Sequence, residues 1–226
     1  MQTPSLRLRH LALGALCATA LVGCPSPNIY GTARTLPVGT IQHTAALDTV
    51  GVSRGGNGIF TPTLPTYQLR LGVADRVDLG FRLANLATLG FDAKINFVRG
   101  PFDLAIDPGI QGIYIGGTGS SGGSGAGLVY MNLPIILGFN LSQNFSLIAT
   151  PGIAYALGFS YSSSSSDYNG SGFAARLGAG ANIRVGRSFA IQPELTALYF
   201  PDTDGVFFTG GIGFSFGAQP DYSDVQ

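Results

Sequence analysis

The chain has 226 residues and a formal charge of zero, and only 11% of its residues are charged whereas 45% are hydrophobic. A soluble surface usually carries about 25–35% charged residues, so this composition argues against an ordinary soluble domain. The 34 glycines and 13 prolines argue against long helices. No apolar run of about 18 residues follows the first 23, which excludes a helical membrane span and favours β-structure in lipid.

The first segment is typical of a secretory signal, with basic residues at Arg7 and Arg9 before an apolar stretch from Leu11 to Val22. It ends in Leu21-Val22-Gly23-Cys24, which resembles the lipobox of bacterial lipoproteins. The resemblance implies that residues 1–23 are a lipoprotein signal peptide, that cleavage precedes Cys24, and that this cysteine is lipidated. Ordinary signal cleavage after Ala20 stays open, because Ala18-Thr19-Ala20 has the small residues which that cleavage needs.

Residues 24–38 are expected to form a periplasmic tether between the lipid anchor and the folded domain. Removal of Arg7 and Arg9 with the signal leaves 10 basic residues (12 minus 2) against 12 acidic ones, a net charge of −2. No cluster of basic residues is evident, so a nucleic-acid partner is not indicated. Cys17 is lost with the signal, which leaves one cysteine and no disulfide.

From about residue 39 to 216 the hydrophobic pattern has a period of two, which predicts strands with two different faces. The clearest pair runs from Tyr67 to Val73 and, after Asp75-Arg76, from Val77 to Leu83. The ten predicted strands run from Gly39 to Gly51, Tyr67 to Val73, Val77 to Leu83, Leu89 to Phe97, Phe102 to Ile115, Gly127 to Asn140, Phe145 to Ser160, Ser171 to Arg184, Phe189 to Tyr199 and Val206 to Phe216. An all-β, antiparallel, up-and-down transmembrane barrel of about ten strands fits this pattern, with eight strands as the main alternative.

The predicted connections alternate in length. The short ones are Asp75-Arg76, Arg99 to Pro101, Leu141 to Asn144 and Gly186 to Ser188, and the long ones are Val52 to Thr66, Gly116 to Ala126 and Tyr161 to Gly170. Transmembrane barrels have short periplasmic turns and longer external loops. The N-terminus is therefore expected on the periplasmic side, where a lipid on Cys24 would lie.

One face of the strands is apolar, as at Leu71, Phe81 and Phe91, and carries no Lys, Arg, Asp or Glu from the second strand to the tenth. A charge on a lipid-facing surface costs about 2–4 kcal/mol at mid-depth, so the apolar face is expected to meet lipid. Aromatic residues near strand ends are candidates for interfacial girdles: Tyr67, Tyr114, Phe139, Phe145, Tyr199 and Phe216. A soluble lipocalin-like binder, with the apolar face inside, is the opposite arrangement.

The other face then points into the lumen with glycines and charges. The predicted lumen charges are Arg70, Asp78, Arg82, Asp92, Lys94, Asp103, Asp107, Arg176, Arg184 and Glu194, five of each sign. Charges in a narrow interior must be paired or hydrated. Because a barrel of about eight strands is filled by side chains, ten strands favour a packed, ion-paired lumen.

The span 39–216 resembles the small bacterial outer-membrane β-barrel proteins (OmpA-, OmpX- or porin-like). The resemblance implies an outer-membrane location, with the membrane lipid as surroundings and insertion by the barrel-assembly machinery. That machinery reads an aromatic residue at the end of the last strand, and Phe214-Ser215-Phe216 matches such an ending. A C-terminal tail, residues 217–226, follows it.

No catalytic group stands out. Gly117-Thr118-Gly119-Ser120-Ser121-Gly122 has the spelling of a dinucleotide fingerprint without the helix it requires, and the serines at 162–166 suggest another surface loop. Asp202-Thr203-Asp204-Gly205 resembles the start of a calcium loop but lacks the later ligands, which favours a turn. His43 is the one histidine beyond the signal, so a His-dependent catalytic pair is not expected.

The sequence thus predicts a non-enzymatic outer-membrane barrel lipoprotein without metal or cofactor. Its role is expected to be structural or in surface interactions, with long loops available to partners. A narrow channel or transporter for small solutes through the charged lumen is the alternative.

Overall fold

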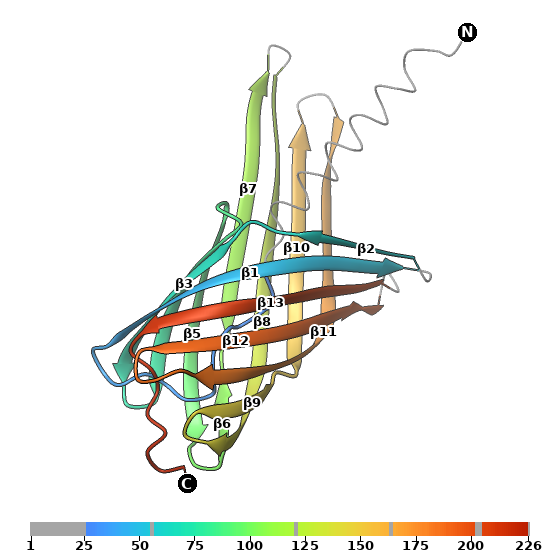
Figure 1. The fold of residues 1–226 in the computed structure, drawn as a ribbon. Coiled ribbons are helices and arrows are strands. Elements are labelled where there is room, and N and C mark those ends of the chain that lie inside the picture. The colour runs from blue at the N-terminus through green and yellow to red at the C-terminus, as the bar shows by residue number, and fades with distance from the viewer. Residues whose placement is uncertain (1–25, 55–56, 120–121, 163–164, 202–204, 226) are drawn as a thin grey trace.

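A computed structural model shows a closed antiparallel β-barrel and describes residues 26–54, 57–119, 122–162, 165–201 and 205–225 (Figure 1). The strands are β1 (Ile41–Arg54), β2 (Asn57–Pro62), β3 (Thr66–Ala74), β4 (Val77–Ala84), β5 (Thr88–Val98), β6 (Phe102–Ile106), β7 (Gly109–Gly119), β8 (Gly122–Ser142), β9 (Phe145–Ala149), β10 (Gly152–Ser162), β11 (Ser165–Arg184), β12 (Phe189–Phe200) and β13 (Gly205–Gly217). Within the described part of the chain, no helix is long and apolar enough to cross a bilayer.

Ten strands form the wall of the barrel, as the alternating pattern predicts. The segments β6 and β7 make one wall strand and β9 and β10 make another, while β2 folds back on the end of β1. The wall closes where β1 pairs with β13, from Gln42 opposite Gly217 to Ser53 opposite Val206. The prediction of an all-β, ten-stranded, up-and-down barrel is confirmed.

Prolines divide two of the wall strands that the sequence pattern treats as continuous. Pro108 lies between β6 and β7, and Pro151 lies between β9 and β10. Proline has no N–H to donate to a neighbouring strand. Each proline carbonyl still accepts a hydrogen bond, from the backbone N–H of Ala93 (3.0 Å) and of Ile135 (2.8 Å) respectively. The wall therefore stays closed across both prolines.

The apolar face of the wall points outward and the polar face points inward. On neighbouring strands, the Phe91 side chain is 59% exposed whereas Asp78 is fully buried. Phe81 and Phe91 pack edge to face on the outer surface, with ring centroids 5.4 Å apart. This arrangement is the inverse of a soluble protein and is the one that lipid requires, so the lipocalin-like alternative is wrong.

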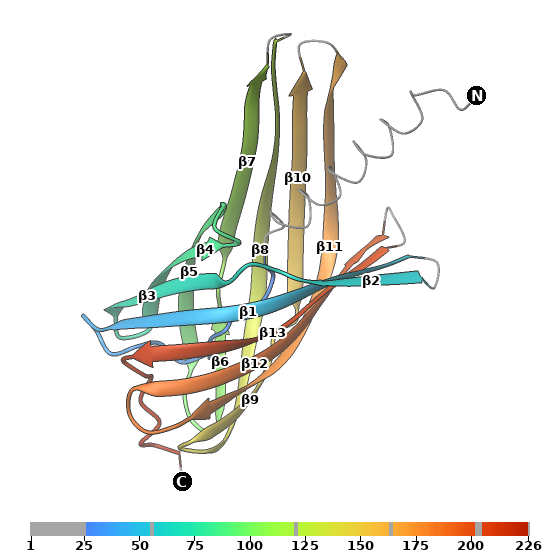
Figure 2. The ribbon, with the colours of Figure 1, turned by 45° about the horizontal axis from the view of Figure 1, so that its top comes forward.

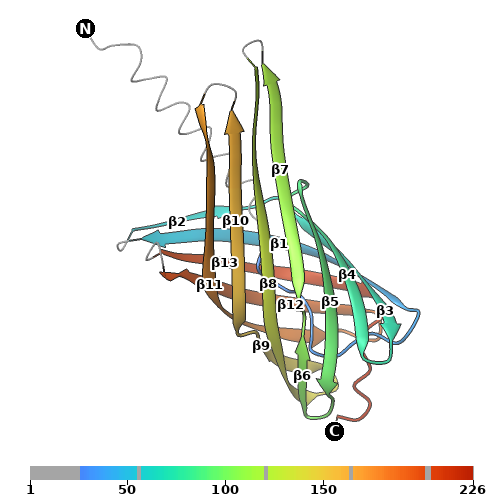
Figure 3. The same cartoon turned by 180° about the vertical axis from the view of Figure 1, so that it is seen from behind.

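Two hairpins extend beyond the rest of the wall at one end, which we call the hairpin end (Figure 2). The opposite end, which holds the connections β3–β4, β5–β6, β8–β9 and β11–β12, is the short-turn end. Seen from behind, β7, β8, β10 and β11 lie side by side (Figure 3). Among the described residues, β7 above Gly112 pairs with β8 alone, and β11 before Ala175 pairs with β10 alone.

This projecting sheet replaces the loops expected at 116–126 and 161–170. Strand pairing continues to Gly119 opposite Gly122 and to Ser162 opposite Ser165. Glycine and serine have low strand propensity and show no apolar alternation, so the sequence pattern indicates a loop. The hydrogen bonds of four adjacent strands maintain the sheet there instead.

Candidate functional site: the barrel interior

Residues 26–36 lie inside the barrel, where they form what we call the plug, whereas Pro37 and Val38 are exposed. Asn28, Tyr30 and Leu36 are all almost completely buried. Residues 26–36 of the expected tether are thus within the lumen. The physical reason is that small inward side chains leave room for a chain, and the charged groups of the wall need partners that its backbone provides.

The plug runs along the barrel axis, with its first residue, Ser26, toward the hairpin end and its last residues at the short-turn end. Thr35 is at the short turn β3–β4, where its hydroxyl donates to the Asp75 carbonyl (3.0 Å). Ser26 is at the other limit, and its carbonyl accepts from Arg82 Nη1 (2.9 Å) and Gln111 Nε2 (3.0 Å). Arg82 is close to the end of β4 at Ala84. The plug therefore fills the lumen along most of its length.

The basic side chains of the wall bind carbonyl oxygens of the plug. Arg82, Lys94 and Arg176 each donate to at least one of them. The bonds run from Arg82 to Ser26 (2.9 Å) and Asn28 (2.5 Å), from Lys94 to Thr32 (3.0 Å) and Arg34 (2.6 Å), and from Arg176 to Pro27 (2.8 Å). Hydrogen bonds to charged groups contribute about 1.5–3 kcal/mol each, so these contacts hold the plug firmly.

The acidic side chains bind the N–H groups of the plug. Glu194 accepts from the backbone N–H groups of Ile29 (2.9 Å) and Tyr30 (2.7 Å). Asp78 accepts from the backbone N–H of Leu36 (3.0 Å). The basic side chains of the wall thus bind the carbonyl groups of the plug backbone, and the acidic side chains bind its N–H groups.

Ion pairs within the wall are also present. Arg70 Nη2 lies 2.6 Å from Asp92 and 3.2 Å from Asp107, and Lys94 Nζ lies 3.1 Å from Asp78. Arg176 lies 3.6 Å from Glu194. All ten residues predicted as lumen charges have side chains directed inward, and Arg82, Asp103 and Arg184 find their partners elsewhere in the interior.

Asp48 is an interior acid that the sequence analysis missed. It accepts from Asn28 Nδ2 (2.9 Å), from the Ser26 hydroxyl (3.2 Å) and from the Tyr30 hydroxyl. Its place on the same strand face as Gln42 and Thr44 was the available signal, since alternation puts all three inside.

Glycines of β13 provide the space for Tyr30. A Cβ added at Gly211 would lie 2.1 Å from the Tyr30 hydroxyl, and one at Gly213 would lie 2.8 Å from its ring. The apolar side of the plug packs against other strands in a buried cluster made of Ile29, Ala33, Ala105, Ile136 and Ile148. The plug is therefore fitted to the wall by shape as well as by charge.

The C-terminal tail, residues 217–225, covers the short-turn end. The Gln42 amide donates to the Ala218 carbonyl (3.0 Å), and the ring of Tyr222 is buried beneath Arg34 and Arg184, whose guanidinium carbons lie 4.4 and 3.6 Å from its centre. Burial raises the pKa of the Tyr222 hydroxyl.

Arg34 joins the plug, the wall and the tail. It pairs with Asp103 of β6 (2.9 Å) and with Asp224 of the tail, and it donates to the Gly100 carbonyl (2.9 Å). Arg34 is not among the predicted lumen charges, because it stands in a segment without any periodic pattern.

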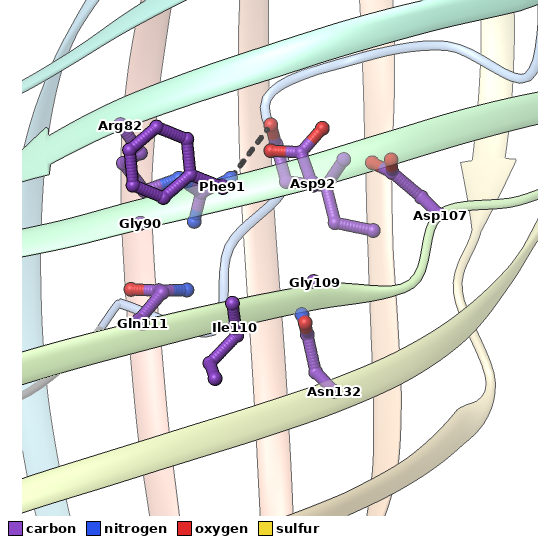
Figure 4. Close-up of a pocket in the computed structure, with 10 residues that line it drawn as sticks. Arg82, Gly90, Phe91, Asp92, Asp107, Gly109, Ile110, Gln111 and Asn132 are labelled. Atoms are coloured by element: carbon purple, nitrogen blue, oxygen red, sulfur yellow. Dashed lines mark hydrogen bonds between the residues drawn. The ribbon is translucent and has the colours of Figure 1, made fainter.

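A small cavity remains between the plug and the wall, with room for about one water molecule. Figure 4 shows Arg82, Asp92, Asp107, Gln111 and Asn132 around it. Asp107 Oδ1 and Gln111 Oε1 are buried without a hydrogen-bond partner among the described residues. Such acceptors suit a bound water, and the cavity is too small for a solute path.

Several predicted features lie elsewhere or beyond the described residues. His43 is on the outer face, where its Nδ1 is 2.6 Å from the Tyr67 hydroxyl. The described residues contain no group of three His, Cys, Asp or Glu side chains arranged to hold a metal. The signal peptide with Cys24, and residues 202–204 of the calcium-like motif, are outside the described part, and the Gly117–Gly122 motif is the β7–β8 hairpin apart from its undescribed residues 120–121.

Comparison with known proteins finds similar folds. No protein-family model matches the chain, and no curated protein sequence matches it. Among solved structures it is similar to Ail, the attachment invasion locus protein of Yersinia pestis, in complex with the heparin analogue sucrose octasulfate, at 12% identity and a TM-score of 0.48, covering 80% of this chain and 99% of that one. Neisserial surface protein A is 8% identical, with a TM-score of 0.42, and the match covers 78% of this chain and 96% of that one. The outer membrane protein OprG of Pseudomonas aeruginosa is 10% identical, with a TM-score of 0.38, and the match covers 84% of this chain and 99% of that one.

Proposed function

We propose that this chain is a bacterial outer-membrane barrel lipoprotein with a closed lumen and a structural or surface-interaction role. The observation that carries the proposal is that the plug fills the lumen while the tail covers its short-turn end. A barrel closed in this way separates the two sides of the membrane rather than connecting them.

The outer surface supports a place in the membrane. Apolar side chains cover it along the strands, and aromatic residues stand at both ends, as at Tyr114 and Phe216. Phe216 is exposed at the end of β13, and the chain turns away at Gly217, whose φ is +91°. The tail therefore leaves the strand end open to the barrel-assembly machinery.

A channel would require the plug to leave the lumen. Withdrawal of the plug would break the hydrogen bonds that Arg82, Glu194 and Asp48 make with it, all in one step. Breaking one buried charge pair costs about 3–5 kcal/mol, and several such contacts would be lost together. These contacts favour a permanently closed barrel over the channel alternative.

The projecting sheet supports the surface role. It extends past the wall at the hairpin end, which by the usual asymmetry of turns and loops faces outward from the cell. In the described part of the chain its two outer strands, β7 above Gly112 and β11 before Ala175, have a paired strand on one side only. Free strand edges of this kind accept extended segments of partners. We propose no catalytic activity, because the His43 imidazole and the interior acids lie on opposite faces of the wall.

Conductance in planar bilayers tests the closed lumen. The intact protein is expected to give no steps, whereas a chain lacking residues 26–36 is expected to conduct through the exposed charged lumen. Heat-modifiable migration on a gel verifies that the shortened chain still closes. Steps from the intact protein that disappear in Arg82→Gln or Asp92→Asn would overturn the proposal and establish the channel.

A further inference from the structure

The direction of the plug determines where the chain before Ser26 must go. Ser26 is held by three hydrogen bonds: its carbonyl accepts from Arg82 and Gln111, and its hydroxyl donates to Asp48 (3.2 Å). Residues 27–36 occupy the lumen between Ser26 and the short-turn end. The preceding chain therefore has its way open toward the hairpin end and closed toward the other.

The barrel wall beside Ser26 is short at the hairpin end. β4 ends at Ala84 and β5 begins at Thr88, whereas β8 and β11 rise far above them (Figure 2). Arg82, which binds Ser26, is two residues below the end of β4, and two strand residues rise about 7 Å. Cys24 is two residues before Ser26 and can lie up to about 7 Å from it. The chain before Ser26 is thus long enough to reach the level of this rim within about two residues.

The outer surface at this rim is apolar. Leu86, in the β4–β5 turn, is 69% exposed, and Leu89 and Phe91 continue the apolar surface along β5. Acyl chains on a cysteine at the rim would meet hydrocarbon-facing side chains as soon as they crossed it. Each CH₂ that is buried contributes about 0.8 kcal/mol.

We propose that the mature N-terminus leaves the barrel at the hairpin end, so that the lipid on Cys24 is held in the outer leaflet of the membrane. The inference rests on the proposed function, namely an outer-membrane lipoprotein, and it replaces the expected periplasmic N-terminus. A lipid in this position also keeps the plug in place, because the acylated end cannot be drawn down through the lumen.

The amine chemistry of this chain permits a sharp test. Lys94 is the one lysine of the sequence, and it is buried in the lumen. Pro25→Lys therefore adds a single reactive amine next to Cys24, and Gln226→Lys adds one at the C-terminus as the matched control. Intact cells are treated with a membrane-impermeant amine-reactive biotin reagent, before or after permeabilisation of the outer membrane, and mass spectrometry locates the label.

We expect Pro25→Lys to be labelled on intact cells and Gln226→Lys only after permeabilisation. Labelling of both variants only after permeabilisation would overturn the surface position of the N-terminus while leaving the closed barrel untouched. Release of the protein into the aqueous fraction, or conductance by the intact protein, would instead defeat the proposed function. Heat-modifiable migration of each variant verifies the fold, and the unsubstituted chain gives the background label.

Discussion

Arg34 shows how much of this fold depends on one side chain. Its guanidinium contacts the wall at Asp103, the tail at Asp224 and the ring of Tyr222, so three separate parts of the chain meet on it. Asp103 is itself 1% exposed. A buried carboxylate that has lost its cation is costly, since neither water nor another charge replaces it.

Replacement of Arg34 by methionine is therefore expected to destabilise the barrel by about 3–5 kcal/mol. Urea unfolding in detergent micelles, followed by circular dichroism, measures the change. Arg76→Met is the control, because its ion pair with Asp75 is exposed and such pairs contribute at most about 1 kcal/mol. Equal midpoints for the two variants would show that Arg34 does not stabilise the interior.

At the scale of elements, the strands follow from the sequence and the plug does not. Alternation of Phe81 and Asp78 across one strand predicts both the pairing and the face that meets lipid, because each strand carries its own period-two signal. The plug has no period, and its partners, such as Glu194, are remote along the chain. Only the three-dimensional closure of the wall reveals that the wall charges bind a backbone.

The interior charges illustrate the same division. Alternation suffices to direct Arg82 and Lys94 inward, and ion pairs such as Lys94 with Asp78 follow from neighbouring strands in register. Arg82, however, binds plug carbonyls rather than an acid. Partners supplied by an unpatterned segment cannot be predicted from strand periodicity, so periodicity alone overestimates the number of ion pairs within the wall.

The tail is an element whose docking depends on pH. The hydrogen bond from Arg34 lowers the pKa of the Asp224 carboxylate below its ordinary value, which is about 3.9 in an unfolded chain. Because the folded pKa is the lower one, the contribution is complete above about pH 4 and is lost as the pH falls through the folded pKa. The protection of amide hydrogens in residues 218–225, taken relative to the intrinsic exchange rate at each pH, is expected to fall there.

Asp224→Asn provides the matched control for the tail. It keeps the size of the side chain but removes the titrating group, so amide protection in the tail is expected to be lower than in the parent at neutral pH and to change less on acidification. A parent and a variant with the same pH response would show that the tail is held by other groups.

At the scale of the whole molecule, the interior is electrically balanced. The described interior contains six basic side chains (Arg34, Arg70, Arg82, Lys94, Arg176 and Arg184) and six acidic ones (Asp48, Asp78, Asp92, Asp103, Asp107 and Glu194). A neutral set of charges can be enclosed in lipid at lower cost than an unbalanced one. Charge balance, the plug and the tail together make the barrel a closed unit from which the projecting sheet extends.

Because the closed barrel and the projecting sheet are separate parts, we predict that the sheet can be shortened without loss of barrel stability. Removal of residues 115–126 and 160–168, with an Asn-Gly turn joining Tyr114 to Gly127 and another joining Phe159 to Asn169, deletes strand segments that pair only with one another. The shortened chain is expected to keep heat-modifiable migration and a free energy of unfolding within about 1 kcal/mol of the parent.

Ile136→Ala calibrates the measurement, because that side chain is fully buried against the plug and its truncation should cost about 2–5 kcal/mol. A shortened chain as unstable as Ile136→Ala would mean that the four projecting strands are part of the folding unit. Retention of stability would instead indicate that they are free to vary for binding, since a sheet that adds nothing to closure is constrained only by the partners that it contacts.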